Sequence, residues 1–199
     1  MYSIVIAGIP ASGKTTLAKF LSRQMGIPWF SKDGIKERLF DTVGFQSREE
    51  KVRLGIASQE LLYYAAEQLM QCGLPFILEN NFENGSREGL VRLLEAYSYQ
   101  AITILLTGDY RQIYQRFLAR EQSPQRHRGH VANDCYPGSK SHSQAVSYEN
   151  FVRGIQARGM DRFTVGGPRI ILDTTHPEQV DYQSLLRQID AYREGTSHD

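Results

Sequence analysis

The sequence predicts an α/β fold in which a five-stranded parallel sheet lies between two layers of helices, a three-layer sandwich. Two observations support this prediction. Short apolar runs bounded by turn residues recur along the chain, as expected for strands that are covered by helices on both faces. Between them lie longer segments whose apolar residues repeat every three or four positions, the spacing of a helix with one buried face. Such alternation favours parallel strands joined by right-handed crossovers.

Five runs are the predicted strands, and helices fill the intervals between them. The strands are expected at Tyr2–Ala7, Pro28–Ser31, Pro75–Glu79, Ala101–Thr107 and Arg169–Leu172. Helices are expected from the end of a glycine-rich loop to Gly26, and at Asp33–Gly44, Arg48–Gln71, Ser86–Tyr97, Asp109–Glu121 and Glu178–Arg193. The apolar face of the longest helix is expected to include Val52, Ile56, Leu61, Leu62 and Leu69.

The segment Gln122–Tyr148 differs from the rest of the chain. It is rich in Ser, Gly, Pro, Asn and His, shows little periodicity, and is too long for an ordinary connection. Segments of this kind are usually functional lids or disordered insertions, and the arginines here favour a lid. We therefore expect a single domain over residues 1–199, with an arginine-rich lid at about residues 116–148.

The composition is that of an ordinary globular protein. Hydrophobic residues make up 41% of the chain and charged residues 23%, and the formal net charge is +1, so no global field attracts nucleic acid or an anionic membrane. The two cysteines have no metal-ligand spacing, which is typical of a reducing compartment. The first strand begins at Tyr2 and no apolar run approaches the ~20 residues of a membrane span, so a cytoplasmic location is expected.

The most specific motif follows the first predicted strand. Residues 8–15 read Gly-Ile-Pro-Ala-Ser-Gly-Lys-Thr, the pattern G-x-x-x-x-G-K-[ST] between a strand and a helix. Its glycines let successive backbone N–H groups turn inward around phosphate oxygens. Lys14 is placed to reach the β- and γ-phosphates, and Thr15 to join a magnesium shell. The motif therefore predicts a nucleoside triphosphate with Mg²⁺ rather than a glycine turn that binds nothing. The loop residues expected to bind it are Gly8, Ala11, Ser12, Gly13, Lys14, Thr15 and Thr16.

Asp33 and Lys36 follow the second predicted strand. Ligands of parallel sheets gather at the carboxyl ends of the strands, so Asp33 is expected to face the γ-phosphate, accept a proton from an acceptor hydroxyl and orient its attack. Capping of the next helix would also explain Asp33. Lys36 lies one turn further on the same face and is a candidate for holding an anionic group of the acceptor. The alternative is a solvated lysine.

Polar residues end the third predicted strand, at Glu79, Asn80 and Asn81. An acidic residue in this position, beside a phosphate loop, is placed to hold magnesium through water or to contact the acceptor. Glu79 is the candidate for these roles, with Asn80 and Asn81 as hydrogen-bonding neighbours and Asn81 as an acceptor contact. The alternative is a strand-terminal turn, since Asn is a good turn residue.

Four arginines lie on the fifth predicted helix and in the irregular segment. Arg116 and Arg120 are four residues apart and share a helix face, and Arg126 and Arg128 follow. In phosphoryl-transfer enzymes, arginines on a mobile segment bring positive charge to the γ-phosphate on closing, and an arginine can stack on adenine. We expect the cluster to act on the nucleotide, although any one of these arginines alone is explained by solvation.

Together the motifs resemble a known family. GIPASGKT, SKDGIKERLF, ILENNF and RHRGH are similar to sequences of the small P-loop kinases related to polynucleotide 5′-kinase, chloramphenicol phosphotransferase and zeta toxin. The similarity is greatest to uncharacterised ATP-binding, kinase-like proteins with an AAA domain. It covers most of the chain, from the first strand to the lid, and implies a P-loop NTPase fold.

The resemblance also implies residue roles. An Asp after the second strand acts as catalytic base in these relatives, which corresponds to Asp33, and a basic residue three positions later contacts the acceptor in some, which corresponds to Lys36. Lid arginines contact the ATP phosphates and one arginine stacks on adenine; the corresponding residues are Arg120, Arg126 and Arg128 for phosphate and Arg116 for adenine. The chain departs from the family pattern at Arg128, where Pro is expected, and at Glu79, where many P-loop proteins have Asp.

The sequence thus predicts an ATP-dependent kinase that transfers the γ-phosphoryl group to a hydroxyl of an unidentified small molecule. The residues expected to be catalytic are Lys14, Asp33, Arg120 and Arg126; those at the acceptor are Asp33, Lys36, Glu79 and Asn81; those at Mg²⁺ are Thr15 and Glu79. One alternative is an ATPase or switch without a dedicated acceptor, although the fourth strand ends Leu-Thr-Gly-Asp rather than in a guanine-reading Asn-Lys-x-Asp.

A second alternative is a polynucleotide or nucleotide-sugar kinase. Residues 111–162 are more basic than acidic, but their aromatic and basic residues are not interleaved as a strand-binding groove would require. Nucleic acid therefore ranks below a small molecule as the acceptor. The sequence does not indicate an oligomeric state.

Overall fold

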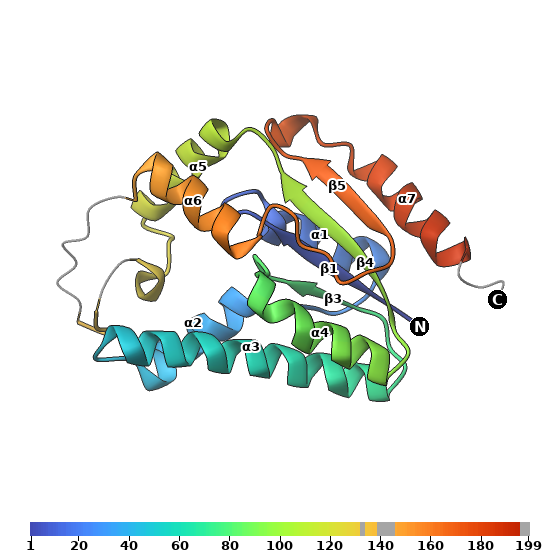
Figure 1. Ribbon diagram of the computed structural model, residues 1–199, viewed down its shortest axis with the longest axis horizontal. Coiled ribbons are helices and arrows are strands. Elements are labelled where there is room, and N and C mark those ends of the chain that lie inside the picture. The colour runs from blue at the N-terminus through green and yellow to red at the C-terminus, as the bar shows by residue number, and fades with distance from the viewer. Residues whose placement is uncertain (132–133, 139–145, 196–199) are drawn as a thin grey trace.

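Five parallel strands form the central sheet (Figure 1). The computed structural model describes residues 1–131, 134–138 and 146–195. The strands are β1 (Tyr2–Gly8), β2 (Trp29–Ser31), β3 (Phe76–Glu79), β4 (Gln100–Thr107) and β5 (Arg169–Asp173). Their order is β2-β3-β1-β4-β5, so β1 lies in the middle between β3 and β4. The predicted five-stranded sheet is confirmed, and each strand ends within one residue of its predicted bounds.

Helices cover both faces of the sheet, as the three-layer prediction requires. They are α1 (Lys14–Met25), α2 (Lys32–Val43), α3 (Arg48–Gln71), α4 (Asn84–Ala96), α5 (Tyr110–Gln122), α6 (Tyr148–Arg158) and α7 (Tyr182–Gly195). On one face Val5 of β1 packs with Leu62 of α3. On the other face the next residue, Ile6, packs with Leu21 of α1 and Leu185 of α7. This alternation along β1 shows why a strand with two covered faces is apolar throughout.

The predicted apolar face of α3 is partly wrong. Leu62 is buried and Leu69 packs against the core, but Val52, Ile56 and Leu61 are 52%, 59% and 44% exposed. The N-terminal half of α3 extends beyond the sheet and lies beside α2 (Figure 1). Its side chains therefore have no sheet beneath them, and the buried positions of the helix are Ser58, Gln59, Leu62, Ala66 and Met70.

Helix α6 was not predicted, because residues up to Tyr148 read as an irregular segment and no helix was expected after it. Its signals are nevertheless local. The Ser147 hydroxyl accepts a hydrogen bond from Asn150 N, and Gly159 ends the helix in the left-handed conformation. Phe151 and Ile155, four residues apart, are the buried positions and pack against α5.

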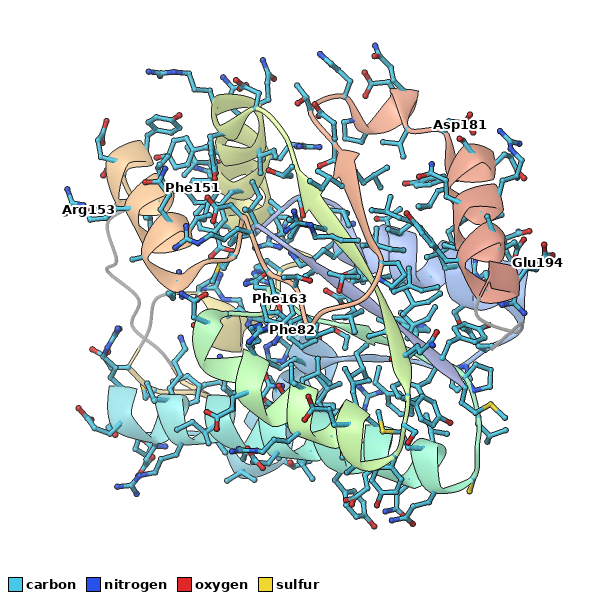
Figure 2. The ribbon with its side chains drawn as sticks, turned by 45° about the vertical axis from the view of Figure 1, so that its right-hand side comes forward. Phe82, Phe151, Arg153, Phe163, Asp181 and Glu194 are labelled. Atoms are coloured by element: carbon cyan, nitrogen blue, oxygen red, sulfur yellow. The ribbon has the colours of Figure 1, made fainter. Side chains whose placement is uncertain are left out.

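The segment that follows α6 packs against the residues at the end of β3. The rings of Phe82 and Phe163 stack with centroids 4.9 Å apart, and Figure 2 shows the two side chains facing each other. Gly159 lies against Asn84, the first residue of α4, and Arg158 forms an ion pair with Glu83 at 3.2 Å. These contacts hold residues 158–163 against the turn that carries Asn80 and Asn81.

Two parts of the predicted lid are described, and they differ in structure. Arg116 and Arg120 belong to the regular helix α5, whereas Arg128–His130 form a 3₁₀ turn that rests on α2. Residues 132–133 and 139–145, which the lid prediction includes, lie outside the described residues. Within the described part of the chain no helix is both long and apolar enough to cross a membrane.

Candidate active site

The phosphate loop joins β1 to α1 and brings the N-terminus of α1 to the carboxyl edge of the sheet. Gly13 precedes the helix with φ of 94°, in the left-handed region. Gly8 lies so close to β4 that a Cβ would be 2.2 Å from the Leu106 carbonyl oxygen. Both positions therefore require glycine. Among the described residues, no side-chain cap hydrogen bond forms at the N-cap Gly13, which leaves the first N–H groups of α1 available to an anion at the positive end of the helix dipole.

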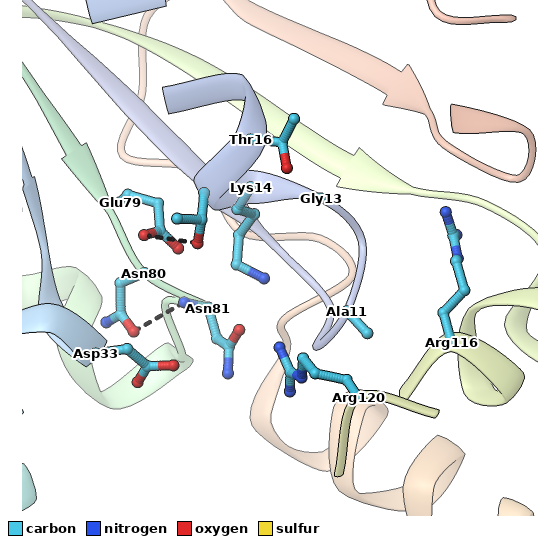
Figure 3. A pocket seen from close by; sticks show the side chains of 11 residues that line it. Ala11, Gly13, Lys14, Thr16, Asp33, Glu79, Asn80, Asn81, Arg116 and Arg120 are labelled. Carbon is cyan, nitrogen blue, oxygen red and sulfur yellow. Dashed lines mark hydrogen bonds between the residues drawn. The ribbon is translucent and has the colours of Figure 1, made fainter. Parts of the chain in front are cut away.

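A cavity of about 300 Å³ lies in front of this loop. Its lining residues are Ala11, Gly13, Lys14, Thr15, Thr16, Asp33, Glu79, Asn80, Asn81, Arg116 and Arg120. In Figure 3 Lys14, Asp33 and Arg120 reach toward the same space from α1, α2 and α5. The structure thus brings together in one cavity eleven residues from four separate parts of the sequence, and ten of them belong to the predicted site.

The Lys14 ammonium group is buried in the loop, where Nζ donates a hydrogen bond to the Ile9 carbonyl oxygen at 2.7 Å. Burial lowers the pKa of Lys14 to about 8, although the Glu79 carboxylate opposes this shift. A buried ammonium with a lowered pKa gains charge stabilisation when an anion binds beside it. This arrangement suits an anionic group that enters the loop from the cavity.

Thr15 and Glu79 form the oxygen-rich side of the cavity. The Thr15 hydroxyl donates to Glu79 Oε2 at 3.3 Å, and Glu79 is 4% exposed. Burial raises the pKa of Glu79, with Lys14, Ser31 and Thr15 acting in the opposite direction. Mg²⁺ prefers hard oxygen ligands and needs only one or two from the protein when phosphates and water supply the others. The hydroxyl and carboxylate here fit that requirement.

Asp33 faces the cavity from the first turn of α2, and it does not cap that helix. The cap is Ser31, whose hydroxyl accepts from Gly34 N at 3.3 Å, so the capping interpretation of Asp33 is wrong. The Asp33 residue is exposed within the concave site. Burial among protein atoms would raise the pKa of Asp33, but the charges of His130 when protonated, Arg126, Lys36 and Lys14 outweigh it and lower the pKa. Asp33 is therefore a carboxylate under ordinary conditions.

Arg116 and Arg120 enter the cavity from α5. One Arg116 amino group donates to the Thr174 carbonyl oxygen at 2.7 Å, which ties α5 to the turn after β5. The Nε atom of each arginine is buried without a hydrogen-bond partner in the described residues. Unsatisfied donors of this kind are costly unless a ligand supplies acceptors. The cavity therefore fits a ligand with several acceptor oxygens, such as a polyphosphate.

Other predicted site residues lie outside the cavity lining. Gly8 and Ser12 are in the loop itself, and Lys36 is on the α2 face beyond Asp33. Arg126 forms a 3.0 Å ion pair with Glu121 and lies near enough to act on the charge of Asp33. Arg128 is exposed on the 3₁₀ turn and is not brought to the cavity.

Two side-chain contacts hold the 3₁₀ turn and its cap His127 on α2. His130 Nε2 lies 3.0 Å from Glu37 Oε1, and His127 Nε2 lies 3.1 Å from Asp41 Oδ1. Burial lowers the pKa of His130 to about 4, with Asp33 opposing and Arg126 reinforcing that shift. Neutral His130 donates to Glu37 in this arrangement. At neutral pH His130 is therefore uncharged, so docking of the turn beside Asp33 does not add a positive charge from this imidazole.

Sequence reasoning missed Gln59. Gln59 lies buried on α3, and its Oε1 accepts from Asn80 Nδ2 at 3.0 Å, while Asn80 Oδ1 accepts from Asn81 N at 2.8 Å. This chain of hydrogen bonds fixes the turn that carries Asn81. No local signal identifies Gln59, because its partner is 21 residues away.

The described fold and cavity have counterparts among known proteins. Residues 4–133 match a family described as an AAA domain, and no curated protein matches the chain. A solved structure of a "putative kinase" from Chloroflexus aurantiacus is 28% identical, with a TM-score of 0.79, and the alignment covers 96% of this chain and 97% of that one.

Two more distant structures share the fold alone. A gluconokinase from Sinorhizobium meliloti has 13% identity and a TM-score of 0.58 over 99% of this chain and 98% of its own. A shikimate kinase from Bacteroides thetaiotaomicron has 13% identity and a TM-score of 0.53 over 98% of both chains. With the family match spanning more than half of the sequence, the chain belongs to the AAA domain family and is a member of the small P-loop kinases.

Proposed function

We propose that this protein is an ATP-dependent kinase that transfers the γ-phosphoryl group of ATP to a hydroxyl of a small molecule. The observation that supports this most directly is the shared cavity, in which the carboxylate of Asp33 stands opposite the phosphate loop and Lys14. A protein that only bound a nucleotide would not need a carboxylate at that place, where it repels phosphate. A kinase needs one to receive the proton of the acceptor.

In the proposed reaction the acceptor hydroxyl lies between Asp33 and the γ-phosphorus. Its oxygen forms a bond to that phosphorus while the bond from the γ-phosphorus to the β–γ bridging oxygen breaks, and ADP leaves with the electron pair. The hydroxyl proton passes to Asp33 and then to solvent. Lys14 and Arg120 stabilise the charge that spreads over the transferring group, and Arg126 adds positive charge from beyond Asp33.

The remaining cavity residues orient the two substrates. Thr15 and Glu79 would hold Mg²⁺, which neutralises charge on the β- and γ-phosphates when it is bound. We expect Arg116, which donates to the Thr174 carbonyl oxygen, to contact the adenine of the nucleotide, and Asn81, which lines the cavity, to contact the acceptor. A cytoplasmic location, an arginine lid at residues 116–148 and a single domain remain predictions of the same proposal.

An Asp33→Asn variant tests the proposal. We expect it to bind ATP as the unaltered protein does but to transfer phosphoryl about 10²–10⁴-fold more slowly, because the amide cannot accept the hydroxyl proton. The measurement is transfer from labelled ATP to a panel of hydroxyl compounds, with oligonucleotides and nucleotide-sugars included. Asp181→Asn is the matched control, since Asp181 is exposed at the start of α7 and asparagine can still cap that helix (Figure 2).

Each outcome has a distinct meaning. Undiminished transfer by Asp33→Asn would show that Asp33 is not the base. ATP hydrolysis that no acceptor stimulates would favour an ATPase or switch. Selective labelling of oligonucleotides, with binding that weakens steeply as salt increases, would favour a polynucleotide kinase.

A further inference from the structure

The turn after β3 carries three residues of the cavity wall, Glu79, Asn80 and Asn81, and it leads into a strained backbone. The next residue, Phe82, has φ of 49°, in the left-handed region that favours glycine, although its side chain is fully buried. Such a conformation persists only where neighbouring groups hold it. The Phe163 ring, which stacks on Phe82, is one of these groups.

A second group that holds the turn is the side-chain amide of Gln59, on α3. Asn80 Oδ1 accepts a hydrogen bond from Asn81 N at 2.8 Å, and this bond fixes which way the Asn80 amide points (Figure 3). The other end of that amide, Nδ2, must therefore face an acceptor, and it donates to Gln59 Oε1 at 3.0 Å. Gln59 is thus the contact through which α3 orients Asn80.

Two backbone hydrogen bonds join the same turn to the phosphate loop. The Asn81 carbonyl oxygen accepts from Gly8 N at 3.2 Å, and Asn80 N donates to the Ile6 carbonyl oxygen at 3.2 Å. Gly8 is the first residue of the loop, and Ile6 lies two residues before it on β1. The turn is therefore connected to Gln59 on one side and to the base of the phosphate loop on the other.

Stability alone does not account for an amide at position 59. Gln59 is 9% exposed, and its Nε2 atom is buried without a partner of ordinary hydrogen-bond geometry in the described residues. The amide acts on the Tyr63 hydroxyl, where it opposes the rise in pKa that burial causes, but that hydroxyl donates to the Ser86 carbonyl oxygen. An unpaired buried donor is costly, and an apolar side chain would avoid the cost. The well-satisfied end of the amide is the end that faces Asn80.

We propose that Gln59 is a positioning residue for phosphoryl transfer. Gln59 holds Asn80, and the turn so held keeps Glu79 and Asn81 at the distance from the phosphate loop that transfer requires. Gln59 does not line the cavity and acts only through Asn80. This inference rests on the kinase function proposed above. A misplacement of about 1 Å among reacting groups lowers a rate on the order of 10²-fold, so a contact outside the cavity is enough to control the reaction.

Four variants separate positioning from structural support. Gln59→Met keeps the length of the side chain but removes the acceptor oxygen. Gln59→Glu offers Asn80 an oxygen acceptor at the same chain length in either protonation state. Gln68→Met makes the first change at an exposed position of α3. Leu62→Ala removes buried apolar volume from the same helix, three residues after Gln59.

The first measurement needs no turnover. Amide hydrogen exchange followed by NMR reports the bond from Asn81 N to Asn80, and the buried Ile104 amide in β4 reports global opening. We expect Asn81 to exchange at least ~10-fold faster in Gln59→Met than in the unaltered protein or in Gln59→Glu, because Asn80 is no longer held. Exchange of Ile104 should remain unchanged in Gln59→Met and become faster in Leu62→Ala.

The second measurement is phosphoryl transfer to the compound of the hydroxyl panel that the unaltered protein phosphorylates fastest. We expect Gln59→Met to lower kcat by about 10–100-fold while the KM for ATP stays within ~2-fold, since the loop that binds the nucleotide keeps its own contacts. Gln59→Glu should recover most of the rate. Gln68→Met and Leu62→Ala should keep the kcat of the folded protein.

Every contrary outcome is distinguishable. Unchanged exchange of Asn81 in Gln59→Met, or equal losses of kcat in Gln59→Met and Gln59→Glu, would overturn the inference. So would a loss of kcat in Leu62→Ala as large as that in Gln59→Met, because the effect would then be one of general packing. Unchanged transfer by Gln59→Met would refute the role of Gln59 and leave the kinase standing, whereas absence of transfer by the unaltered protein would refute the kinase.

Discussion

Lys14 is the loop residue whose pKa we expect to change when a ligand binds. Its ammonium group is enclosed by the loop, satisfied by one carbonyl oxygen and surrounded by little else of opposite charge than Glu79 and Asp33. Because burial disfavours the charged form, the pKa falls from 10.5 to about 8. A triphosphate placed beside Nζ would reverse that effect and draw the proton back.

Nucleotide binding should therefore be accompanied by proton uptake. Near the pKa of about 8 roughly half of the Lys14 side chains are neutral, so binding Mg·ATP analogue should take up about half a proton per protein. About two pH units lower, Lys14 is already charged and this uptake should vanish. The measurement is the binding enthalpy in two buffers of different ionisation enthalpy. Proton release near pH 8, or uptake that does not change with pH, would contradict the assignment.

At the scale of elements, the 3₁₀ turn Arg128–His130 is docked on α2 by shape as well as by hydrogen bonds. Gly129 is buried, and its backbone lies against the Phe40 ring. Phe40 is fully buried, and its ring also contacts those of Phe45 and His130. Glycine is the residue that lets the turn approach the ring this closely. The position of the turn fixes His130 and its neighbour Arg126 near Asp33.

Substitution of Gly129 tests the docking. In Gly129→Ala the new Cβ would lie 2.2 Å from a Phe40 ring carbon, so the turn or the ring must move. We expect a loss of about 1–3 kcal/mol in the free energy of unfolding, as for overpacking, together with faster proteolysis of residues 123–131. Gly85→Ala is the matched control, because a Cβ there has open space within the first turn of α4. Equal stability of the two variants would show that the turn is not packed as described.

Helix α3 shows how an element is divided between two environments. Its C-terminal half lies on the sheet, and its N-terminal half lies beside α2 (Figure 1). The first half therefore shapes the site, through Gly55 and Gln59, while the second half stabilises the core. The exposed Val52 and Ile56 are a consequence of this division rather than of a weak helix.

At the scale of the whole molecule, stability comes from two cores that sandwich the sheet. Leu61 and Leu62 are adjacent on α3 but differ fully in environment, since Leu61 is 44% exposed and Leu62 is 0% exposed. We expect Leu62→Ala to lower the free energy of unfolding by about 2–5 kcal/mol, through lost burial and a cavity. Leu61→Ala should change it by less than about 0.5 kcal/mol. Denaturant unfolding of both variants measures the difference, and similar losses would show that the helix is rotated from its described position.

Local patterns predicted the parts of the fold that depend on neighbours in sequence. The apolar strands, the long helix Arg48–Gln71 and the glycine loop are specified by residues close together in sequence, so their bounds were predicted to within a residue or two. Helix α6 was missed although Ser147 and Gly159 mark its ends, because the irregular residues before it hid the signal. The face of α3 could not be predicted, since burial there depends on where the sheet ends.

The candidate site likewise has one part that local sequence predicted and another that only the tertiary structure decided. Gly8 to Thr15 identified the nucleotide half of the site, because a phosphate loop is a continuous piece of backbone that needs particular residues in order. Asp33 and Glu79 were found by their positions after strands, which parallel topology brings to one edge. The partner of Asn80 and the burial of Arg116 Nε and Arg120 Nε are relations between distant segments, so only their packing in three dimensions decided them.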